Sequence, residues 1–263
     1  MTDRHRLLEQ AEHVIMTASE TLVTMQGTQL RAQRKTLRDI VTEADLASER
    51  LIIEGLRRLT PNCAILSEEA GASGPIGGPR WIIDPLDGTV NYAAGLPWFS
   101  VTVAYQQNSE TELGVAHAPA AGMIARYIRG ELATVNDTPA RVSRTKALDD
   151  AVVSVVLGSH LPTADVHRTA AVIRRLGETI RGVRVVVSGA LELSLVAAGR
   201  LDAFVSLKAD IVSHAAAMPL VRAAGGRVTT LDGRDARDED EERIASNDVI
   251  HEDLLRCLRE ALR

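Results

Sequence analysis

Apolar side chains recur along the chain in two spacings, and each spacing predicts one kind of element. A spacing of three to four residues, as at Leu7, Ala11 and Val14, places apolar positions on one face of a helix. It predicts helices over residues 5–26, 43–59, 163–176, 190–198, 214–224 and 248–262. Short apolar runs predict strands over residues 64–66, 81–83, 99–105, 113–117, 123–129, 152–157, 184–187, 201–206, 227–231 and 243–246. Strands and helices interspersed in this way indicate a layered α/β fold.

Two stretches follow neither spacing. Residues 71–79 are rich in Gly, Pro and Ser, and residues 232–243 carry a dense mixture of charges, so both are predicted to be solvated connections. The pattern also changes near residues 140–150, from mostly strands to alternating strand and helix. This change predicts an N-terminal α+β half over residues 1–145, with most of the candidate metal ligands. The C-terminal α/β half, over residues 146–263, is expected to contribute the substrate pocket.

The composition narrows the class of protein. Hydrophobic residues make up 45% of the 263 residues and charged residues 25%, so a buried core is expected. No apolar run approaches the ~20 residues of a membrane-spanning helix, so no membrane partner is expected. The net charge of -5 and the lack of a basic cluster argue against nucleic acid as a partner. Two distant cysteines, Cys63 and Cys257, exclude a disulfide framework and indicate a cytoplasmic protein.

Carboxylates stand at the ends of predicted elements in four short segments, residues 42–45, 67–69, 84–89 and 210–214. The third segment is the most informative. The predicted strand over residues 81–83 runs directly into Asp84, and Pro85 fixes the turn that follows. Asp87 then returns a second carboxylate, and Gly88 allows the backbone to approach a ligand closely.

Gly88 and Thr89 are predicted to open a short helical turn whose free N–H groups form an anion site. Oxygen ligands beside amide donors suit a hard cation that carries a phosphate. The alternative interpretation is an Asp-Pro…Asp-Gly turn that binds nothing. An EF-hand loop is excluded, because its alternating ligands and terminal Glu are missing.

Two other acidic segments have structural interpretations as well. Glu68 and Glu69 follow the predicted strand over residues 64–66. Adjacent acids on a loop are common and usually have no function, but their position at a strand end makes a functional role equally favoured. Thr42 and Asp45 have the spacing of a capping box, which by itself favours a structural role for Asp45 at the helix start.

Taken together, these segments resemble the inositol monophosphatase family, the lithium-sensitive sugar phosphatases related to fructose-1,6-bisphosphatase. The resemblance rests on Lys35 with DIVTEAD over residues 39–45, ILSEE over residues 65–69, and WIIDPLDGTVNY over residues 81–92. It continues through residues 114–119, VAAGRLDA over residues 196–203, and AGG over residues 224–226. The segments follow the family's order over nearly the whole chain. Residues 84–92 are highly specific, whereas the glycine pair is not.

The resemblance implies an αβαβα sandwich of the sugar phosphatase type, a homodimer, and hydrolysis of a small sugar or polyol phosphate monoester by water. It implies two or three Mg²⁺ ions per site. By matching position, Glu68, Asp84 and the main-chain carbonyl of Leu86 hold one ion, while Asp84 and Asp87 hold a second. Two ions can acidify a water and stabilise the leaving oxygen in an in-line displacement.

The resemblance also assigns catalytic and substrate-binding roles. Glu68 counts among the catalytic residues, Asp45 and Thr89 orient the attacking water, and the amides of Gly88 and Thr89 receive the phosphate. The substrate pocket is expected to include Asp87, Ser188, Gly189, Ser206 and Ser213. An ordinary helix N-cap is the alternative interpretation of Ser188 and Gly189.

Two positions depart from the family pattern. Counting back from Gly226 places Ser213 where the family has a further metal-binding Asp, and Ser206 where animal inositol phosphatases have a sugar-contacting Glu. We therefore expect weaker, substrate-assisted binding of the second ion. Ser213 is predicted to be the N-cap of the helix that ends before Gly225, with a kink at Pro219. Asp210 and His214 lie near enough in sequence to substitute, but are interpreted as solvent-facing.

Three functions remain in competition. The first is a Mg²⁺-dependent phosphomonoesterase. The second is a catalytically attenuated relative that binds a phosphorylated sugar or acts as a scaffold, and the missing acid at Ser213 motivates it. The third is a biosynthetic phosphatase whose substrate is not inositol phosphate, which the replacements at Ser206 and Ser213 favour.

Overall fold

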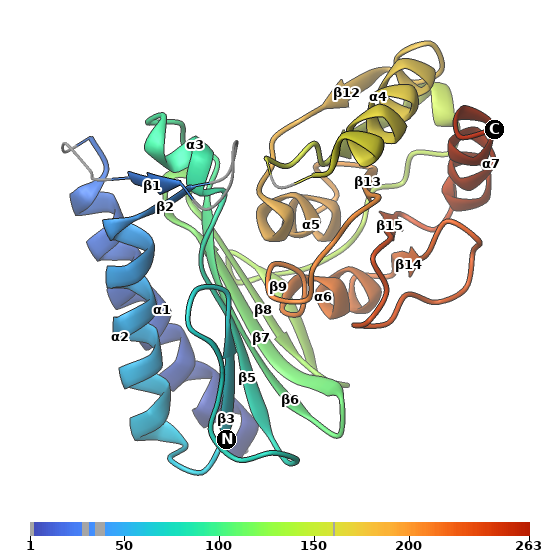
Figure 1. The fold of residues 1–263 in the computed structure, drawn as a ribbon. Helices are drawn as coiled ribbons and strands as arrows, with labels where there is room; N and C mark the ends of the chain where they lie inside the picture. Colours follow the sequence, from blue (N-terminus) through green and yellow to red (C-terminus); the bar gives the residue numbers. More distant parts are fainter. Residues whose placement is uncertain (1–2, 28–31, 35–39, 160) are drawn as a thin grey trace.

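Five layers build the molecule in the order helix, sheet, helix, sheet, helix (Figure 1). The computed structural model describes residues 3–27, 32–34, 40–159 and 161–263. The outer face of the first sheet is covered by α1 (Asp3–Met25) and α2 (Glu43–Leu59), and the space between the sheets is filled by α5 (Gly189–Ala197) and α6 (Ala217–Ala223). The second sheet is covered by α4 (Thr163–Gly177) and α7 (His251–Ala261). The predicted αβαβα sandwich is confirmed.

The first sheet has eight strands in the order β10-β9-β8-β7-β6-β5-β3-β4, and of its pairs only β3 and β5 run parallel. Its strands are β3 (Ala64–Ser67), β4 (Gly71–Ser73), β5 (Arg80–Asp87), β6 (Ser100–Gln107), β7 (Glu110–Ala118), β8 (Met123–Ile128), β9 (Leu132–Val135) and β10 (Thr138–Pro139). A separate ribbon pairs β1 (Ala32–Arg34) with β2 (Ile40–Thr42).

The second sheet has five strands in the order β12-β11-β13-β15-β14. They are β11 (Val152–Val155), β12 (Gly182–Arg184), β13 (Ala203–Ser206), β14 (Arg227–Thr229) and β15 (Arg243–Ser246). β11 runs parallel to β12 and β13, whereas β15 is antiparallel to both of its neighbours. The carboxyl ends of β11 and β13 therefore lie side by side. The remaining helices are α3 (Thr89–Ala93) and the 3₁₀ turns Pro119–Ala121 and Leu148–Asp150.

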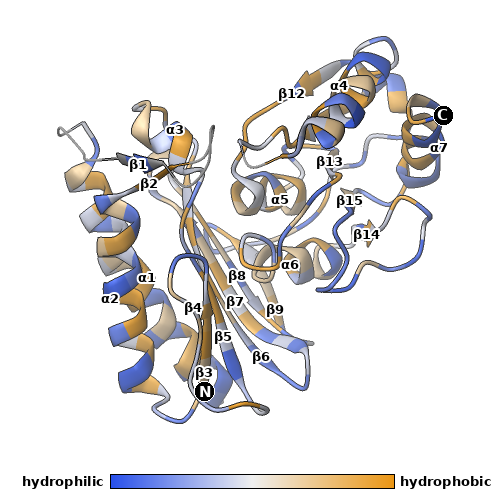
Figure 2. Cartoon of the chain, in the orientation of Figure 1, coloured by the Kyte–Doolittle hydropathy of each residue, from blue (hydrophilic) through white to orange (hydrophobic). Residues whose placement is uncertain are grey.

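Burial follows the layers. α1 buries one stripe, with Leu8, Ala11, Ile15, Ala18 and Leu22, against the first sheet, and polar residues gather on its outer side (Figure 2). α5 lies between two sheets and buries Gly189 to Ser194 on every side. Each buried large apolar side chain contributes ~1.5–3 kcal/mol, so the three clusters between the layers hold the sandwich together.

Several elements differ from the prediction. Residues 71–73, expected in a loop, pair with β3 as β4. The strand expected over residues 184–187 is wrong in position, because β12 ends at Arg184 and Val187 has a φ of 62° that no strand accommodates. The helix expected over residues 214–224 begins only at Ala217. Lys35 and Asp39, which the family resemblance included, lie outside the described residues.

Residues 141–147, together with a 3₁₀ turn, connect β10 to β11 and so link the two sheets. The division into halves of residues 1–145 and 146–263 falls in this stretch and remains a proposal. Among the described residues, no helix combines the length and apolar character needed to cross a membrane.

Candidate functional site

A bulge in β5 brings two aspartates to one cavity. The pairing of β5 with β6 shifts register between Asp84 and Asp87. In a regular strand, residues three positions apart point to opposite faces, and an inserted residue resets this alternation. Both aspartates consequently line the same cavity. The prediction that the strand ends at Asp84 is wrong, since β5 continues through the bulge to Asp87.

The turn after β5 requires glycine. Gly88 has a φ of 93°, and a Cβ at this position would lie 2.8 Å from the carbonyl oxygen of Trp98. Gly88 is the N-cap of α3, which confirms the short helical turn predicted to open at Thr89. The side chain of Asn91 donates to the carbonyls of Trp98 at 2.9 Å and Val186 at 2.7 Å. The turn is thus fixed against both neighbouring segments.

α2 presents a buried polar face to the site. Asp45 lies on this face, and Ser48 and Glu49 follow it by about one turn. The hydroxyl of Ser48 donates to the carbonyl of Pro85 at 2.7 Å, inside the bulge. Oε1 of Glu49 accepts from Ser67 Oγ at 2.5 Å and from the amides of residues 69 and 70 at 3.2 and 2.9 Å. The helix therefore positions both the bulge and the turn that carries Glu68.

Asp45 both caps α2 and contacts Thr89 in the site. Its Oδ2 accepts from the amide and hydroxyl of Thr42, at 2.8 and 2.5 Å, and completes the capping box of α2. Its Oδ1 accepts from Thr89 Oγ1 at 2.9 Å. Burial raises the pKa of Asp45, partly offset by the hydrogen bonds from Thr42 and Thr89. The cap therefore still leaves one carboxylate oxygen for the site.

Asp84 is the most perturbed carboxylate of the site. It is buried, its Oδ1 accepts from the amide of Leu86 at 3.2 Å, and its Oδ2 accepts from Ser213 Oγ at 2.8 Å. Burial raises its pKa well above the ordinary range, and the neighbouring charges of Glu68, Asp87 and Asp210 raise it further. A cation beside Asp84 would remove this repulsion.

Asp87 ties β5 to the start of α5. Its Oδ2 accepts from Ser100 Oγ at 3.0 Å, from Ser188 Oγ at 2.8 Å and from the amide of Ala190 at 2.9 Å. Within the described part of the chain, its Oδ1 accepts one hydrogen bond, from the amide of Gly189 at 3.2 Å. Burial raises the pKa of Asp87, and these hydrogen bonds oppose the effect. Ser188 occupies the N-cap position, but its hydroxyl points to Asp87 and caps no amide of its own helix.

The segment before α6 corrects three predictions. Ser213 is not the N-cap of this helix, because α6 begins at Ala217 and the Ser213 hydroxyl is bound to Asp84. Pro219 falls in the first turn of α6, where amides lack a helical partner, so no kink is required. His214 is not solvent-facing: it is 4% exposed and packs edge-on against Phe204.

Asp210 is exposed, as predicted, but at the edge of the cavity. Its Oδ1 accepts from the amide of Ser213 at 2.9 Å, and its Oδ2 lies 3.4 Å from Ser213 Oγ. The Ser213 hydroxyl therefore stands between the carboxylates of Asp84 and Asp210.

These groups meet in one cavity of about 250 Å³. The predicted residues that line it are Glu68, Asp84, Leu86, Asp87, Gly88, Thr89, Gly189, Ser206 and Ser213. Asp45 and Ser188 lie behind this wall and reach it through Thr89 and Asp87. A larger open cleft, lined by Arg80, Tyr127 and Arg222 among others, contains none of the predicted residues.

Several residues of the site were missed by sequence reasoning. Ser48 and Glu49 could have been found from the sequence, because their spacing from Asp45 places the three polar residues on one face of the helix, and this face is buried. Ser100 and Glu192 could not have been found in this way. Glu192 is fully buried, accepts the amide of Ser188 at 3.0 Å and the hydroxyl of Ser154, and burial raises its pKa to about 7.

The donor atoms of the cavity fit a hard cation. Its acidic groups offer carboxylate oxygens, and Leu86 adds its main-chain carbonyl. Within the part of the chain that the structure describes, no three His, Cys, Asp or Glu side chains are gathered to hold one ion. An ion here would thus use two carboxylates together with carbonyl, water or phosphate oxygens, which is a common arrangement for Mg²⁺.

The layered sandwich and its carboxylate-lined cavity have the architecture that the family resemblance implied. Residues 3–263 match the Inositol monophosphatase family, and the chain belongs to that family. It is 36% identical over 231 residues to the "Fructose-1,6-bisphosphatase/inositol-1-monophosphatase" of Thermotoga maritima, covering 88% of this chain and 87% of that relative.

Other relatives carry a different name. The "Nus factor SuhB" of Pasteurella multocida is 36% identical over 208 residues, covering 78% of this chain and 76% of its own. The crystal structure of the extragenic suppressor protein suhB from Bartonella henselae superposes with a TM-score of 0.92 at 31% identity, covering 97% of this chain and 99% of that one.

Proposed function

We propose that the chain is a cytoplasmic, Mg²⁺-dependent phosphatase that hydrolyses a small sugar or polyol phosphate monoester. The observation that carries the proposal is the bulge in β5, which places Asp84 and Asp87 in one cavity with Glu68. Membership of the inositol monophosphatase family supports the reaction class, and the phosphatase name of the T. maritima relative agrees with it.

In this proposal, Glu68, Asp84 and the carbonyl of Leu86 would hold the first Mg²⁺, and Asp84 and Asp87 would hold the second. When bound, Mg²⁺ lowers the pKa of water and stabilises negative charge on the leaving oxygen. Among the described residues, Oδ1 of Asp87 accepts one amide, so it is the atom of this carboxylate with capacity left for an ion.

We infer that Asp210 compensates in part for the acid missing at Ser213. The Ser213 hydroxyl lies 2.8 Å from Asp84 Oδ2 and 3.4 Å from Asp210 Oδ2. A cation near this hydroxyl would have a carboxylate on each side. The second ion is still expected to bind more weakly than in relatives with an aspartate, because Asp210 is exposed and more strongly hydrated.

Asp45 and Thr89 are proposed to hold the attacking water. Thr89 Oγ1 donates to Asp45 Oδ1 at 2.9 Å or to the carbonyl of Leu86 at 3.0 Å, which leaves its lone pairs for a water hydrogen. Burial raises the pKa of Asp45 and makes it a better proton acceptor. The water proton can then reach Asp45 through the Thr89 hydroxyl. Glu68 is proposed to be a catalytic residue together with Asp45 and Thr89.

The substrate is proposed to lie against both halves of the cavity. The amides of Gly88 and Thr89 receive the phosphate, and Gly189, Ser206 and Ser213 line the remaining wall, with Ser188 behind it. The direct experiment is phosphate release from a panel of sugar phosphates with and without Mg²⁺. We expect release that depends on Mg²⁺; no release from any member would contradict the proposal.

A second candidate is an attenuated relative that acts mainly by binding. Ser213 in place of the expected acid favours it, as do the relatives named SuhB. The same panel separates the two candidates. Sugar phosphates should raise the Tm of a binding protein in a thermal-shift assay, but such a protein releases no phosphate from them.

We further propose a homodimer. Four exposed apolar side chains, Val90, Leu96, Trp98 and Val185, lie on segments joined by the Asn91 side chain. A second copy would remove this apolar surface from water. Sedimentation velocity tests the proposal, and a monomer at all concentrations would contradict it.

A further inference from the structure

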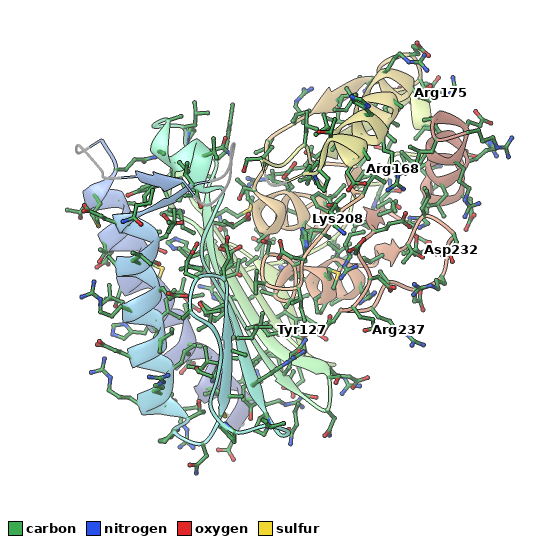
Figure 3. All side chains as sticks on the ribbon, viewed as in Figure 1. Tyr127, Arg168, Arg175, Lys208, Asp232 and Arg237 are labelled. Carbon is green, nitrogen blue, oxygen red and sulfur yellow. The ribbon has the colours of Figure 1, made fainter. Side chains whose placement is uncertain are left out.

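One cationic side chain stands in the otherwise acidic cavity. Lys208 is the only lysine or arginine among the described residues that line it, beside the carboxylates of Glu68, Asp84, Asp87 and Asp210. Figure 3 labels Lys208, which lies beyond the end of β13, in the region between the two sheets. A lone cation in such a cavity has no role in binding Mg²⁺, which it would repel.

The fold fixes where Lys208 stands. It follows β13 by two residues, beyond the buried Ser206, and residues 156–159 follow the parallel neighbour β11. The amide of Val156 donates to the carbonyl of Val205 at 2.9 Å, so the two strand ends continue side by side into the cavity wall. Ligands of open α/β sheets bind beyond the carboxyl ends of parallel strands. Lys208 is therefore placed to contact a ligand.

Lys208 is paired with Glu241. The two side chains form an ion pair in which Lys208 is 34% and Glu241 is 62% exposed. Exposed pairs of this kind contribute little, about 0–1 kcal/mol. The chain segment itself is fixed independently, since the amide of Ala209 donates to the carbonyl of Glu241 at 2.5 Å. A substrate anion can thus replace the Glu241 carboxylate without moving the backbone.

We propose that Lys208 makes this site select phosphate monoesters that carry a second anionic group, a carboxylate or another phosphate. The proposal rests on the proposed phosphatase function. Ser206 stands where a sugar-contacting acid was expected, so the same wall has lost a negative charge and carries a positive one. A phosphate monoester without a second anionic group would leave Lys208 paired with Glu241, whereas a second anionic group would bind Lys208 directly.

Matched substrate pairs test the proposal. Fructose 1,6-bisphosphate is compared with fructose 6-phosphate, and 3-phosphoglycerate with glycerol 3-phosphate, so that each pair differs by one anionic group. We expect kcat/KM to be about tenfold higher for at least one doubly anionic member, since hydrogen bonds to charged groups are typically of this strength. The preference should fall at high salt. The preferred member identifies the carboxylate or the phosphate as the second group.

Three variants assign the preference to Lys208. Lys208→Ala should raise KM about tenfold for the substrate with two anionic groups and leave KM unchanged for the partner that has only the phosphate. Glu241→Gln should lower KM for the doubly anionic substrate, because it removes a competing carboxylate. Lys146→Ala is the matched control, since Lys146 is exposed and outside the cavity.

The outcomes separate this proposal from the phosphatase function. Phosphate release with no preference within the pairs, or an equal rise in KM for both members in Lys208→Ala, overturns the role of Lys208 and leaves the phosphatase intact. No release from any substrate refutes the phosphatase function itself. A preference that survives in Lys208→Ala would place the second anion elsewhere in the cavity and also overturn the proposal.

Discussion

Single atoms decide what each carboxylate of the cavity can bind. Asp87 Oδ2 is filled by three donors, whereas its Oδ1 has one. Asp84 Oδ2 has the Ser213 hydroxyl, which also lies near Asp210. At this scale, Ser213 is a bridge between two acids. Its effect on the proposed second ion therefore depends on Asp210.

Asp210→Asn should weaken Mg²⁺ binding about tenfold, in line with the loss of one charged contact. Ser213→Asp in the same background should restore binding, because it returns a carboxylate to the neighbouring position. Calorimetric titration with Mg²⁺ and a non-hydrolysable phosphate measures both effects. Asp149→Asn, an exposed acid outside the cavity, is the control. If Asp210→Asn binds Mg²⁺ as tightly as the parent, the compensating role is refuted.

Residue types at the site were easier to predict than their contacts. The motif over residues 84–89 named Asp84, Asp87 and Gly88 because turn chemistry and acidity are local properties. The environment of Ser213 was predicted incorrectly, since its hydroxyl binds Asp84, which is 129 positions away. A local pattern favours a helix cap at such a serine and contains no information on a partner from another sheet.

Among the elements, α2 does the most to position the site. Its side chains at Asp45, Ser48 and Glu49 bind Thr89, the bulge in β5 and the turn after β3. The apolar face of the same helix packs on the first sheet. Packing of the helix therefore sets the positions of the catalytic segments.

Glu49→Ala should destabilise the protein by about 2 kcal/mol, because the buried hydroxyl of Ser67 and two partly exposed amides lose their acceptor. It should also lower phosphatase activity, since the turn that carries Glu68 loses its anchor. Urea unfolding and phosphate release measure the two effects. Glu54→Ala, an exposed position on the same helix, should change neither. Equal stability of the two variants would show that Glu49 does not anchor the turn.

Most helices were predicted well because their apolar periodicity extends over many residues, and some short strands were predicted from their apolar runs. The range of α2 matches the prediction of residues 43–59, and β15 matches residues 243–246. The bulge in β5 and the short strand β4 were not predicted. Both arise from pairing with a neighbouring strand, and the isolated sequence of a strand does not specify its partner's register.

For the whole molecule, the middle layer couples the two sheets. α5 and α6 share a core with residues of both sheets, and Glu192 of α5 is fully buried within this layer. Its carboxyl group accepts from Ser188 and Ser154, which belong to the helix start and to β11. An ionisable group at this depth makes global stability depend on pH.

Burial raises the pKa of Glu192 from an ordinary value of 4.5 to about 7. Between these values the folded protein binds more protons than the unfolded chain, so this group's contribution to stability falls as pH rises from about 4.5 to about 7. Glu192→Gln removes that contribution, which is at most about 3 kcal/mol. Urea unfolding of both proteins should show that the free energy of unfolding of Glu192→Gln, relative to that of the parent, is higher at pH 8 than at pH 5. A difference independent of pH would contradict the buried, titrating carboxyl.

The order of layers was predictable from the family resemblance, whereas the periodicity alone gave only a layered α/β class. Which helices enter the middle layer is a property of the assembled molecule. α5 gives a partial signal, since apolar residues surround it on all sides, as expected for a helix between two sheets. The position of Lys208 in the cavity could not be predicted from the sequence, because a single lysine after a strand is usually a solvated charge.

We propose above all that Asp84 directs divalent cations to a phosphate in this cavity. This proposal is tested most directly by comparing Mg²⁺-dependent phosphate release by the parent protein and by Asp84→Asn, with circular dichroism as the check of folding. We predict a loss on the order of a hundredfold or more with the fold intact, because Asp84 belongs to both proposed ion sites. A folded Asp84→Asn protein with undiminished turnover would contradict the account.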